Sequence, residues 1–211
     1  MITVWGGGTQ RTLRVHWMCH ELDIDYRSEL IGSRTGATNT ESFRALNPKE
    51  KIPVLMDGDL VLTESAAIIT YLAEHHGQGK NLIPEAGSQD KARYDQWLAF
   101  VQMELDAHTL YVIRKHRDLA HLYGEAPAAI ETAIAGFQKQ VAVAAQHLND
   151  RAFLVGDHFS GADLMLTSAL EWAKAYDIPL DPGLTEYHER QISRPAYIVA
   201  RKHNFSISAG A

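Results

Sequence analysis

The chain has 211 residues and a formal net charge of −6, from 20 lysines and arginines against 26 aspartates and glutamates. Hydrophobic residues make up 45% of it, a share typical of a globular protein and too high for a disordered one. An acidic chain of this kind lacks the basic surface of a nucleic-acid binder. It has one cysteine, no recognisable signal peptide and no apolar run of membrane-spanning length. We therefore expect a cytoplasmic protein without disulfides and without membrane contact.

The first 77 residues predict a small α/β domain. β-rich runs at residues 2–5 and 25–31 flank a helical stripe formed by Val15, Met18, Cys19 and Leu22. Two short apolar runs then flank Asp57-Gly58-Asp59, a pattern typical of a β-hairpin. A helix should follow over residues 64–76 and end at the next glycine.

The rest of the chain predicts helices. Residues 78–87 contain two glycines and a proline and are interpreted as a linker. Beyond them, two sets of apolar residues recur at helical spacing: Trp97, Val101, Leu105, His108 and Val112, and Ile130, Ile134, Phe137, Val141, Ala145 and Leu148. Such stripes belong to amphipathic helices that pack on one another, so residues 88–211 are predicted to form an all-helical domain.

A capping box is predicted at Ser160-Gly161-Ala162-Asp163. The Ser160 hydroxyl can accept from the Asp163 amide, while the Asp163 carboxylate accepts from the Ser160 amide. Phe159 and Leu164 occupy the positions of a hydrophobic staple. Asp163 could instead be a catalytic acid, but its spacing already explains it as a cap.

Three segments, in this order, carry a resemblance to a known family: Asn47-Pro48-Lys49-Glu50-Lys51-Ile52-Pro53-Val54-Leu55, Glu64-Ser65-Ala66-Ala67-Ile68 and Ser160-Gly161-Ala162-Asp163-Leu164. Arg194-Pro195-Ala196-Tyr197 adds to it. Over nearly its whole length the sequence resembles the cytosolic glutathione transferases. The resemblance implies a thioredoxin-like α/β domain at residues 1–77, an all-α domain at 88–211, a homodimer, and glutathione as the thiol co-substrate.

The resemblance places glutathione along Lys51, Ile52, Pro53, Glu64 and Ser65. The family's proline at position 53 follows a cis bond, which leaves the Ile52 amide and carbonyl to pair with the cysteinyl unit as an added strand does. Ser65 would hold the γ-glutamyl carboxylate at a helix N-terminus, and Glu64 would pair with its ammonium group. Lys51 would face the glycyl carboxylate, with Lys49 either assisting or solvated. Without the family, Pro53 is a proline at a strand start, and Glu64 or Ser65 is an N-cap.

The thiol-activating group departs from the family pattern. A transferase of this kind lowers the pKa of the glutathione thiol, because the thiolate is the nucleophile. The family places Tyr, Ser or Cys after the first strand, but residues 6–13 contain none of them. The closest replacements are the Thr9 hydroxyl and the Gln10 amide, with Arg11 adding positive potential. Thr9 could equally be a plain N-cap, and the main-chain amides of Gln10 and Arg11 would then stabilise the thiolate.

The second substrate is expected to be a small, mostly apolar electrophile bound between the two domains. His108, Tyr111 and Arg114, on the long helix after residue 88, are candidates for its binding wall. Two rival functions remain open. The same thiolate could reduce peroxides or isomerise a substrate, and a chain without the usual Tyr, Ser or Cys could bind glutathione or another ligand without catalysis.

Cys19 and the histidines are interpreted as structural. Cys19 shares the apolar stripe of the first helix, so we expect a buried side chain rather than a catalytic thiol. His16 and His20 have the spacing of two metal ligands on a helix. No His-Glu-x-x-His motif and no third ligand accompany them, so no metal site is predicted.

Overall fold

The computed structural model describes residues 1–207, which form two compact units. The first unit contains residues 1–83 together with the segment that begins at Ser193, and the second contains residues 84–192. The division near residue 83 lies within the predicted linker. The predicted domain 88–211 differs from this division at its end, because the last helix belongs to the first unit; its residues 208–211 lie outside the described residues.

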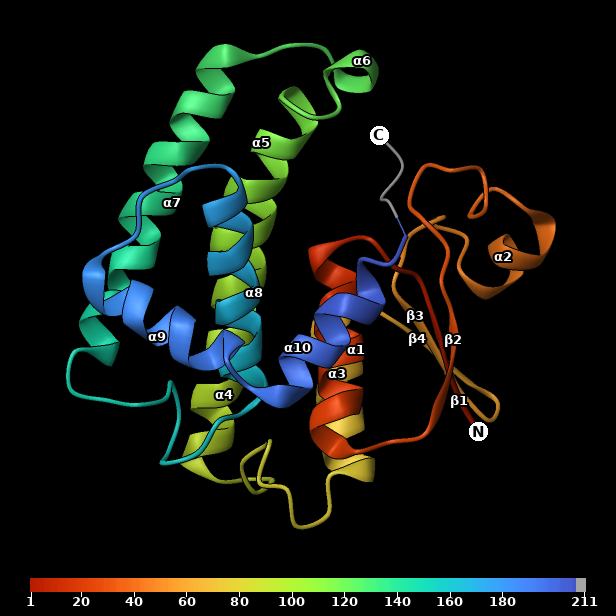
Figure 1. The fold of residues 1–211 in the computed structure, drawn as a ribbon, viewed down its shortest axis with the longest axis horizontal. Helices are drawn as coiled ribbons and strands as arrows, with labels where there is room; N and C mark the ends of the chain where they lie inside the picture. Colours follow the sequence, from red (N-terminus) through yellow and green to blue (C-terminus); the bar gives the residue numbers. More distant parts are fainter. Residues whose placement is uncertain (208–211) are drawn as a thin grey trace. The chain divides into compact units, whose positions relative to one another are not determined.

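A four-stranded mixed sheet, with strand order β2-β1-β3-β4, forms the centre of the first unit (Figure 1). β1 (Ile2–Trp5) runs parallel to β2 (Tyr26–Glu29) and antiparallel to β3 (Val54–Asp57), and β4 (Leu60–Thr63) pairs antiparallel with β3. In this register Val4 lies opposite Ser28 on one side and Leu55 on the other. The predicted hairpin is confirmed, with a left-handed Gly58 (φ +58°) in its turn.

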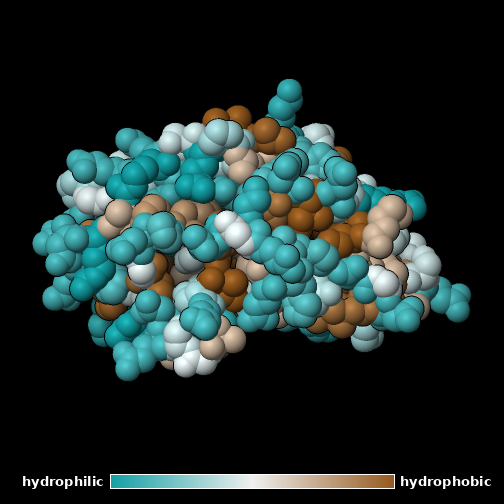
Figure 2. All heavy atoms as spheres, turned by 90° about the horizontal axis from the view of Figure 1, so that it is seen from below, coloured by the Kyte–Doolittle hydropathy of each residue, from teal (hydrophilic) through white to brown (hydrophobic). Residues whose placement is uncertain are grey.

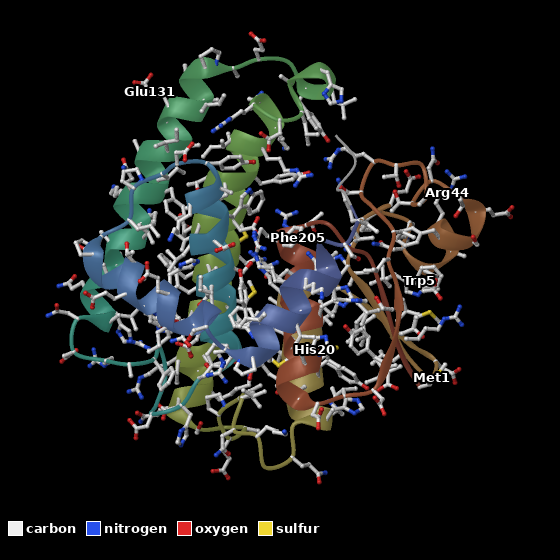
Figure 3. The ribbon with its side chains drawn as sticks, in the orientation of Figure 1. Met1, Trp5, His20, Arg44, Glu131 and Phe205 are labelled. Atoms are coloured by element: carbon white, nitrogen blue, oxygen red, sulfur yellow. The ribbon has the colours of Figure 1, made fainter. Side chains whose placement is uncertain are left out.

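Helices cover both sides of this sheet. α1 (Gln10–Leu22) and α3 (Ser65–His76) lie on one side and the short α2 (Glu41–Leu46) on the other (Figure 1). The predicted stripe of α1 is buried at Val15, Met18, Cys19 and Leu22. The side chain of Trp5, labelled in Figure 3, meets Phe43 of α2 edge to face, with ring centroids 6.2 Å apart. This cluster also includes Ile52 and Val54, so the loop that precedes β3 is fixed in a hydrophobic core.

The last helix, α10 (Pro195–Asn204), packs against α1. The Arg194 guanidinium donates to both carboxylate oxygens of Glu21, at 2.6 and 2.8 Å. The ring of Tyr197 lies 4.9 Å from that of Trp17. These contacts join residues far apart in the sequence, which is why local sequence patterns assigned this helix to the helical domain.

The second unit is entirely helical in its regular structure within residues 84–192. Its elements are α4 (Gln89–Phe100), η1 (Val101–Leu110), α5 (Tyr111–His116), α6 (Ala120–Tyr123), α7 (Pro127–Leu148), α8 (Gly161–Ala175) and α9 (Pro182–Ile192). Most of α8 is buried, and η1 packs against both α7 and α8. Phe137 and Val141 of the predicted α7 stripe are buried, as are Val101 and Leu105 of the preceding one.

The segment η1 is π-helical, which the sequence pattern did not predict. The amide of Tyr111 bonds to the carbonyl of Asp106, five residues earlier. Buried residues recur every four positions at Val101, Leu105, Thr109 and Ile113. A π-helical turn holds more residues than an α-helical turn, so this spacing keeps all four side chains on the buried face.

Polar side chains predominate on the surface drawn in Figure 2, and apolar groups occupy separate small patches. Among residues 1–207, no helix is both long and apolar enough to cross a membrane.

Candidate functional site

The N-terminus of α3 is left open by its own chain. Glu64, which precedes the helix, has φ +70° and ψ 111°, and its side chain makes no capping hydrogen bond. A positive φ in a residue with a side chain costs on the order of 1–3 kcal/mol and often marks a functional position. No acidic residue stands in the first turn of α3. The first amides of the helix, the partial positive charge of its dipole and the Ser65 hydroxyl are therefore available to an anion.

Two side chains hold this helix start from either side. Buried Arg14 of α1 donates from Nη1 to Ser65 Oγ at 3.3 Å. Lys49 Nζ lies 2.5 Å from Glu64 Oε1 and 3.0 Å from Thr63 Oγ1. Lys49, which the sequence suggested only as an assistant, thus pairs with the Glu64 carboxylate at the surface, and the neighbouring Lys51 side chain is exposed as well.

The loop before β3 presents an unpaired main chain at Ile52. The Ile52–Pro53 bond is cis, as expected from the resemblance. Buried Asn47 holds the loop, because its side chain donates to the Lys51 carbonyl at 2.8 Å and accepts from the Lys49 amide at 3.1 Å. Within residues 1–207, neither the amide nor the carbonyl of Ile52 makes a hydrogen bond. An extended peptide can therefore pair there without displacing another segment of the described chain.

The loop formed by Gly6, Gly7 and Gly8 brings the start of α1 beside Ile52. Gly6 has φ +118°, and a Cβ there would lie 2.7 Å from the Ile52 Cβ. Only glycine fits this close approach. The Gly6 and Gly7 amides bond to carbonyls of Glu29 and Ile31, which extends the pairing with β2. The helix that follows therefore starts next to the loop of the cis-proline.

The Thr9 hydroxyl is engaged within a capping box. Its oxygen accepts from the Thr12 amide at 3.1 Å, and the Thr12 hydroxyl accepts from the Thr9 amide at 3.1 Å. Thr12 donates its own proton to an acceptor other than Thr9 Oγ1, either Asn204 Oδ1 at 2.7 Å or the Thr9 carbonyl at 2.9 Å. The 3.0 Å contact between the two hydroxyls is then donated by Thr9. This geometry favours the N-cap interpretation of Thr9, because both its proton and a lone pair are used inside the chain.

The other candidates for thiol activation, Gln10 and Arg11, occupy the first turn of α1 and are half-buried. Their amides are the first two of the helix and point out of its N-terminus. The structure thus brings two helix starts and the Ile52 loop together in the first unit.

The three candidates for the wall of the second-substrate site, His108, Tyr111 and Arg114, lie in the second unit. His108 lines a groove of about 550 Å³ between η1 and α7, opposite small side chains such as Ala129 and Ala133. Tyr111 is covered instead by the ammonium group of Lys115, 5.2 Å from its ring centre. Arg114 does not line this groove.

Asp163 is a structural residue. Its Oδ1 accepts from the Leu154 amide at 2.9 Å and the Tyr187 hydroxyl at 2.8 Å, and its Oδ2 accepts from the amide and hydroxyl of Ser160 at 2.9 and 3.0 Å. The capping box is confirmed, and the side chain is fully buried. Burial raises the pKa of Asp163 even though these hydrogen bonds oppose the shift. A carboxylate with four internal donors and no exposure is not placed to act on a substrate.

Cys19 and His16 are also internal. Cys19 is fully buried, and burial raises the pKa of its thiol to about 12, so it is not a nucleophile at neutral pH. His16 is buried too, which lowers its pKa to about 4. Its Nε2 lies 2.9 Å from the Gly6 carbonyl, which only accepts, so this nitrogen carries the proton. Its Nδ1 then accepts from the Tyr26 hydroxyl at 2.9 Å.

Both ring nitrogens of His16 are thus occupied by protein partners. Within residues 1–207, no group of three or more His, Cys, Asp or Glu side chains is arranged to hold a metal ion.

Arg14 is the site residue that the sequence interpretation missed. A signal was present, because Arg14, Met18 and Leu22 are four residues apart and share the buried face of α1. A charged residue on an apolar helix face is uncommon unless it is paired, so its position could have pointed to a polar partner inside the fold.

Comparison with known proteins gives a consistent result. Residues 11–75 match the family model described as glutathione S-transferase, N-terminal domain, and residues 127–190 match glutathione S-transferase, C-terminal domain. Glutathione S-transferase 3 of Zea mays is 32% identical over 90% of this chain and 79% of its own length. A probable maleylacetoacetate isomerase of Vibrio cholerae is 27% identical over 95% of the chain and 94% of its own length.

Glutathione S-transferase theta-1 of Bos taurus is 33% identical over 70% of this chain, and the match spans 62% of that relative's length. Among solved structures, the glutathione transferase URE2P8 of Phanerochaete chrysosporium, determined with oxidized glutathione, superposes with a TM-score of 0.88 over 97% of this chain and 95% of its own. At 19% identity, this likeness concerns the fold.

Proposed function

Because the chain belongs to the glutathione transferase family, we propose that it binds glutathione in its first unit and presents the thiolate to small, mostly apolar electrophiles. One observation carries the proposal: the unpaired main chain of Ile52 and the open N-terminus of α3 belong to one packed unit. The cysteinyl unit would pair with Ile52 beside Pro53, and Ser65 would hold the γ-glutamyl carboxylate. The Glu64 carboxylate, already paired with Lys49, would also accept from the γ-glutamyl ammonium group, and Lys51 would meet the glycyl carboxylate.

Thiol activation is assigned to the start of α1. Lowering a thiol pKa from about 8.5 to about 6.5 requires roughly 2.7 kcal/mol of preferential thiolate stabilisation. A hydrogen bond to a charged group contributes about 1.5–3 kcal/mol, and a helix N-terminus adds about 0.3–1 kcal/mol. The amides of Gln10 and Arg11, with the Gln10 side chain, supply both kinds of interaction. Thr9 would contribute by capping α1 and not by donating to the thiol, since its hydroxyl is held by Thr12.

Two alternatives have specific support. Glutathione-dependent isomerisation is favoured by the similarity to a protein named as a maleylacetoacetate isomerase. Binding of glutathione without turnover is favoured by the engagement of Thr9 and by the absence of Tyr, Ser and Cys from residues 6–13. Peroxide reduction by the same thiolate is the third possibility.

Retention on immobilised glutathione, followed by three assays, separates these functions. The assays are conjugation of chlorodinitrobenzene, reduction of an organic peroxide, and cis–trans isomerisation of a maleyl substrate. We expect retention and conjugation, with turnover lower in Gln10→Ala than in Thr9→Ala. Retention without any turnover would select the binding protein, and an absence of retention would contradict the proposal. Glu64→Ala should weaken retention, and unchanged affinity would remove Glu64 from the site.

We further propose a cytoplasmic homodimer, as the family resemblance implies. Light scattering on the eluting peak of a size-exclusion column should give twice the chain mass of 23.5 kDa. A peak of single-chain mass at micromolar concentration would contradict this.

A further inference from the structure

Arg14 reaches the proposed glutathione site from inside the protein. It lies in the second turn of α1, and only 1% of its surface is exposed. Its guanidinium Nη1 lies 3.3 Å from Ser65 Oγ, in the first turn of α3. The two helices pack against each other within the first unit, so this contact is fixed by the core rather than by surface side chains.

The direction of this hydrogen bond determines what Ser65 can do. A guanidinium only donates, so Ser65 Oγ is the acceptor. Within residues 1–207, the Ser65 hydroxyl makes no other hydrogen bond. Its proton is therefore available to a ligand, and a ligand that receives it must be an acceptor. Ser65 can donate this proton to a bound carboxylate, because no acceptor in the described chain receives it.

The electrostatic potential at Ser65 also favours a bound anion. The dipole of α3 places a partial positive charge at its first turn, and no acidic side chain stands there. A buried guanidinium adds a full positive charge that solvent and salt screen only weakly. Both effects favour an anion at Ser65.

We propose that Arg14 is a positioning residue for the γ-glutamyl carboxylate of glutathione. It orients Ser65 Oγ as an acceptor, so that the hydroxyl proton is presented to the carboxylate, and it supplies positive potential behind that hydroxyl. The inference rests on the proposed function, because it concerns how the same site recognises one end of glutathione. It assigns selectivity for that carboxylate to a residue that the ligand does not reach directly.

Two ligands and four variants test this role. The ligands are glutathione and 4-aminobutyryl-cysteinylglycine, which is glutathione without the γ-glutamyl α-carboxylate. Titration calorimetry gives the ratio of their affinities for the wild type, Arg14→Gln, Arg14→Lys, Ser65→Ala and the double variant Arg14→Gln/Ser65→Ala. Arg27→Gln is the matched control, because it removes one positive charge from an exposed position of the same unit.

We expect Arg14→Gln to lower the preference for glutathione over the analogue about tenfold, the effect of one charge-assisted hydrogen bond. Arg14→Lys should restore part of it, because the cation is kept while its fixed geometry is lost. Arg14→Gln should change the ratio less in the Ser65→Ala background than in the wild type, because the part of its effect that passes through the Ser65 hydroxyl is already lost there. Arg27→Gln should keep the wild-type ratio.

An unchanged ratio in folded Arg14→Gln would overturn the inference, whatever its melting temperature. If Arg14→Gln does not fold, Arg14→Lys decides, and a ratio equal to that of the wild type would overturn the inference. A wild type that binds glutathione and the analogue equally would also overturn it, while leaving the proposed function standing. A wild type that binds neither ligand would contradict the proposed function and the inference together.

Discussion

The starts of α8 and α3 show two ways in which a helix N-terminus can be completed. At α8, Ser160 and Asp163 form a capping box, and the buried carboxylate has four internal donors. At α3, Glu64 makes no capping bond, and Ser65 receives one hydrogen bond, from Arg14. The first start is complete without a ligand, whereas the second is complete only with an anion. Changes at α8 should therefore alter stability, and changes at α3 should alter binding.

The start of α1 lies between these two cases. Thr9 and Thr12 close it as a capping box, and Asn204 of α10 donates to the Thr9 carbonyl at 3.1 Å. The same helix start adjoins the Ile52 loop, so it belongs to the proposed site while being capped by its own chain. Four predictions sharpen or break the comparison.

Asp163→Ala should have the largest effect on the free energy of unfolding. It leaves the Leu154 amide, the Ser160 amide and the Tyr187 hydroxyl buried without an acceptor, at a cost of about 3 kcal/mol. Urea denaturation measures this loss, and glutathione affinity of the folded fraction should stay within about twofold of the wild type. Asp157→Ala, an exposed position in the same loop, is the control. A loss no greater than that of the control would show that the α8 start is not closed in the way described.

His16 should make the protein less stable in acid. Its pKa is lowered from 6.5 to about 4 by burial, so the unfolded chain binds its proton first. This contribution is fully present above pH 6.5 and falls as the pH drops toward 4. Between about pH 7.5 and about pH 5, we expect a loss of about 2 kcal/mol.

The variant His16→Gln should reduce this pH dependence, because glutamine does not titrate. Chemical denaturation at both pH values, with and without the substitution, measures the difference. If the free energy of unfolding changes equally with pH in the wild type and in His16→Gln, the pH dependence does not come from His16.

Thr9→Ala should lower the free energy of unfolding by about 1 kcal/mol, the usual effect of a lost N-cap. Thr9→Ser keeps the hydroxyl and should restore most of it. Because the Thr9 proton is donated to Thr12, turnover by Thr9→Ala should fall less than about threefold. A much larger fall in kcat, also rescued by serine, would instead identify Thr9 as the thiol donor.

Cys19→Ala should leave glutathione-dependent turnover within about twofold of the wild type, because a fully buried thiol with a pKa of about 12 does not react. Iodoacetamide should modify the native protein only as fast as it unfolds. Rapid labelling of the folded protein, or a large loss of turnover in Cys19→Ala, would contradict a purely structural role.

Much of the fold could be predicted where its signals are local. The Asp57-Gly58-Asp59 turn, the stripe of α1 and the capping box at Ser160 each depend on residues a few positions apart. The placement of α10 depends on Asn204 and Arg194 meeting residues about 170 to 200 positions earlier, which no local pattern encodes. The π-helical form of η1 was missed because a spacing of four residues was interpreted as ordinary α-helix.

In the candidate site, too, some features could be predicted from the sequence and others could not. The segment before β3 and the Glu64-Ser65 pair could be located through the family resemblance, and the cis bond at Pro53 agrees with it. The state of Thr9 could not be predicted, because it depends on hydrogen bonds that link Thr9 to Thr12 and Thr12 to Asn204, which lies 195 residues from Thr9 in the sequence. Arg14 was overlooked because an arginine in a helix is usually solvated, whereas here it is buried in the core of the first unit.

The most direct test of the contrast between the two helix starts is the substitution Ser65→Ala, measured for both stability and glutathione affinity. We predict that the dissociation constant for glutathione rises about tenfold or more, since a hydroxyl bonded to a carboxylate is lost. The free energy of unfolding without ligand should change by less than about 1 kcal/mol. A protein that loses stability but binds glutathione as tightly as before would contradict the account, because the start of α3 would then be a structural cap like that of α8.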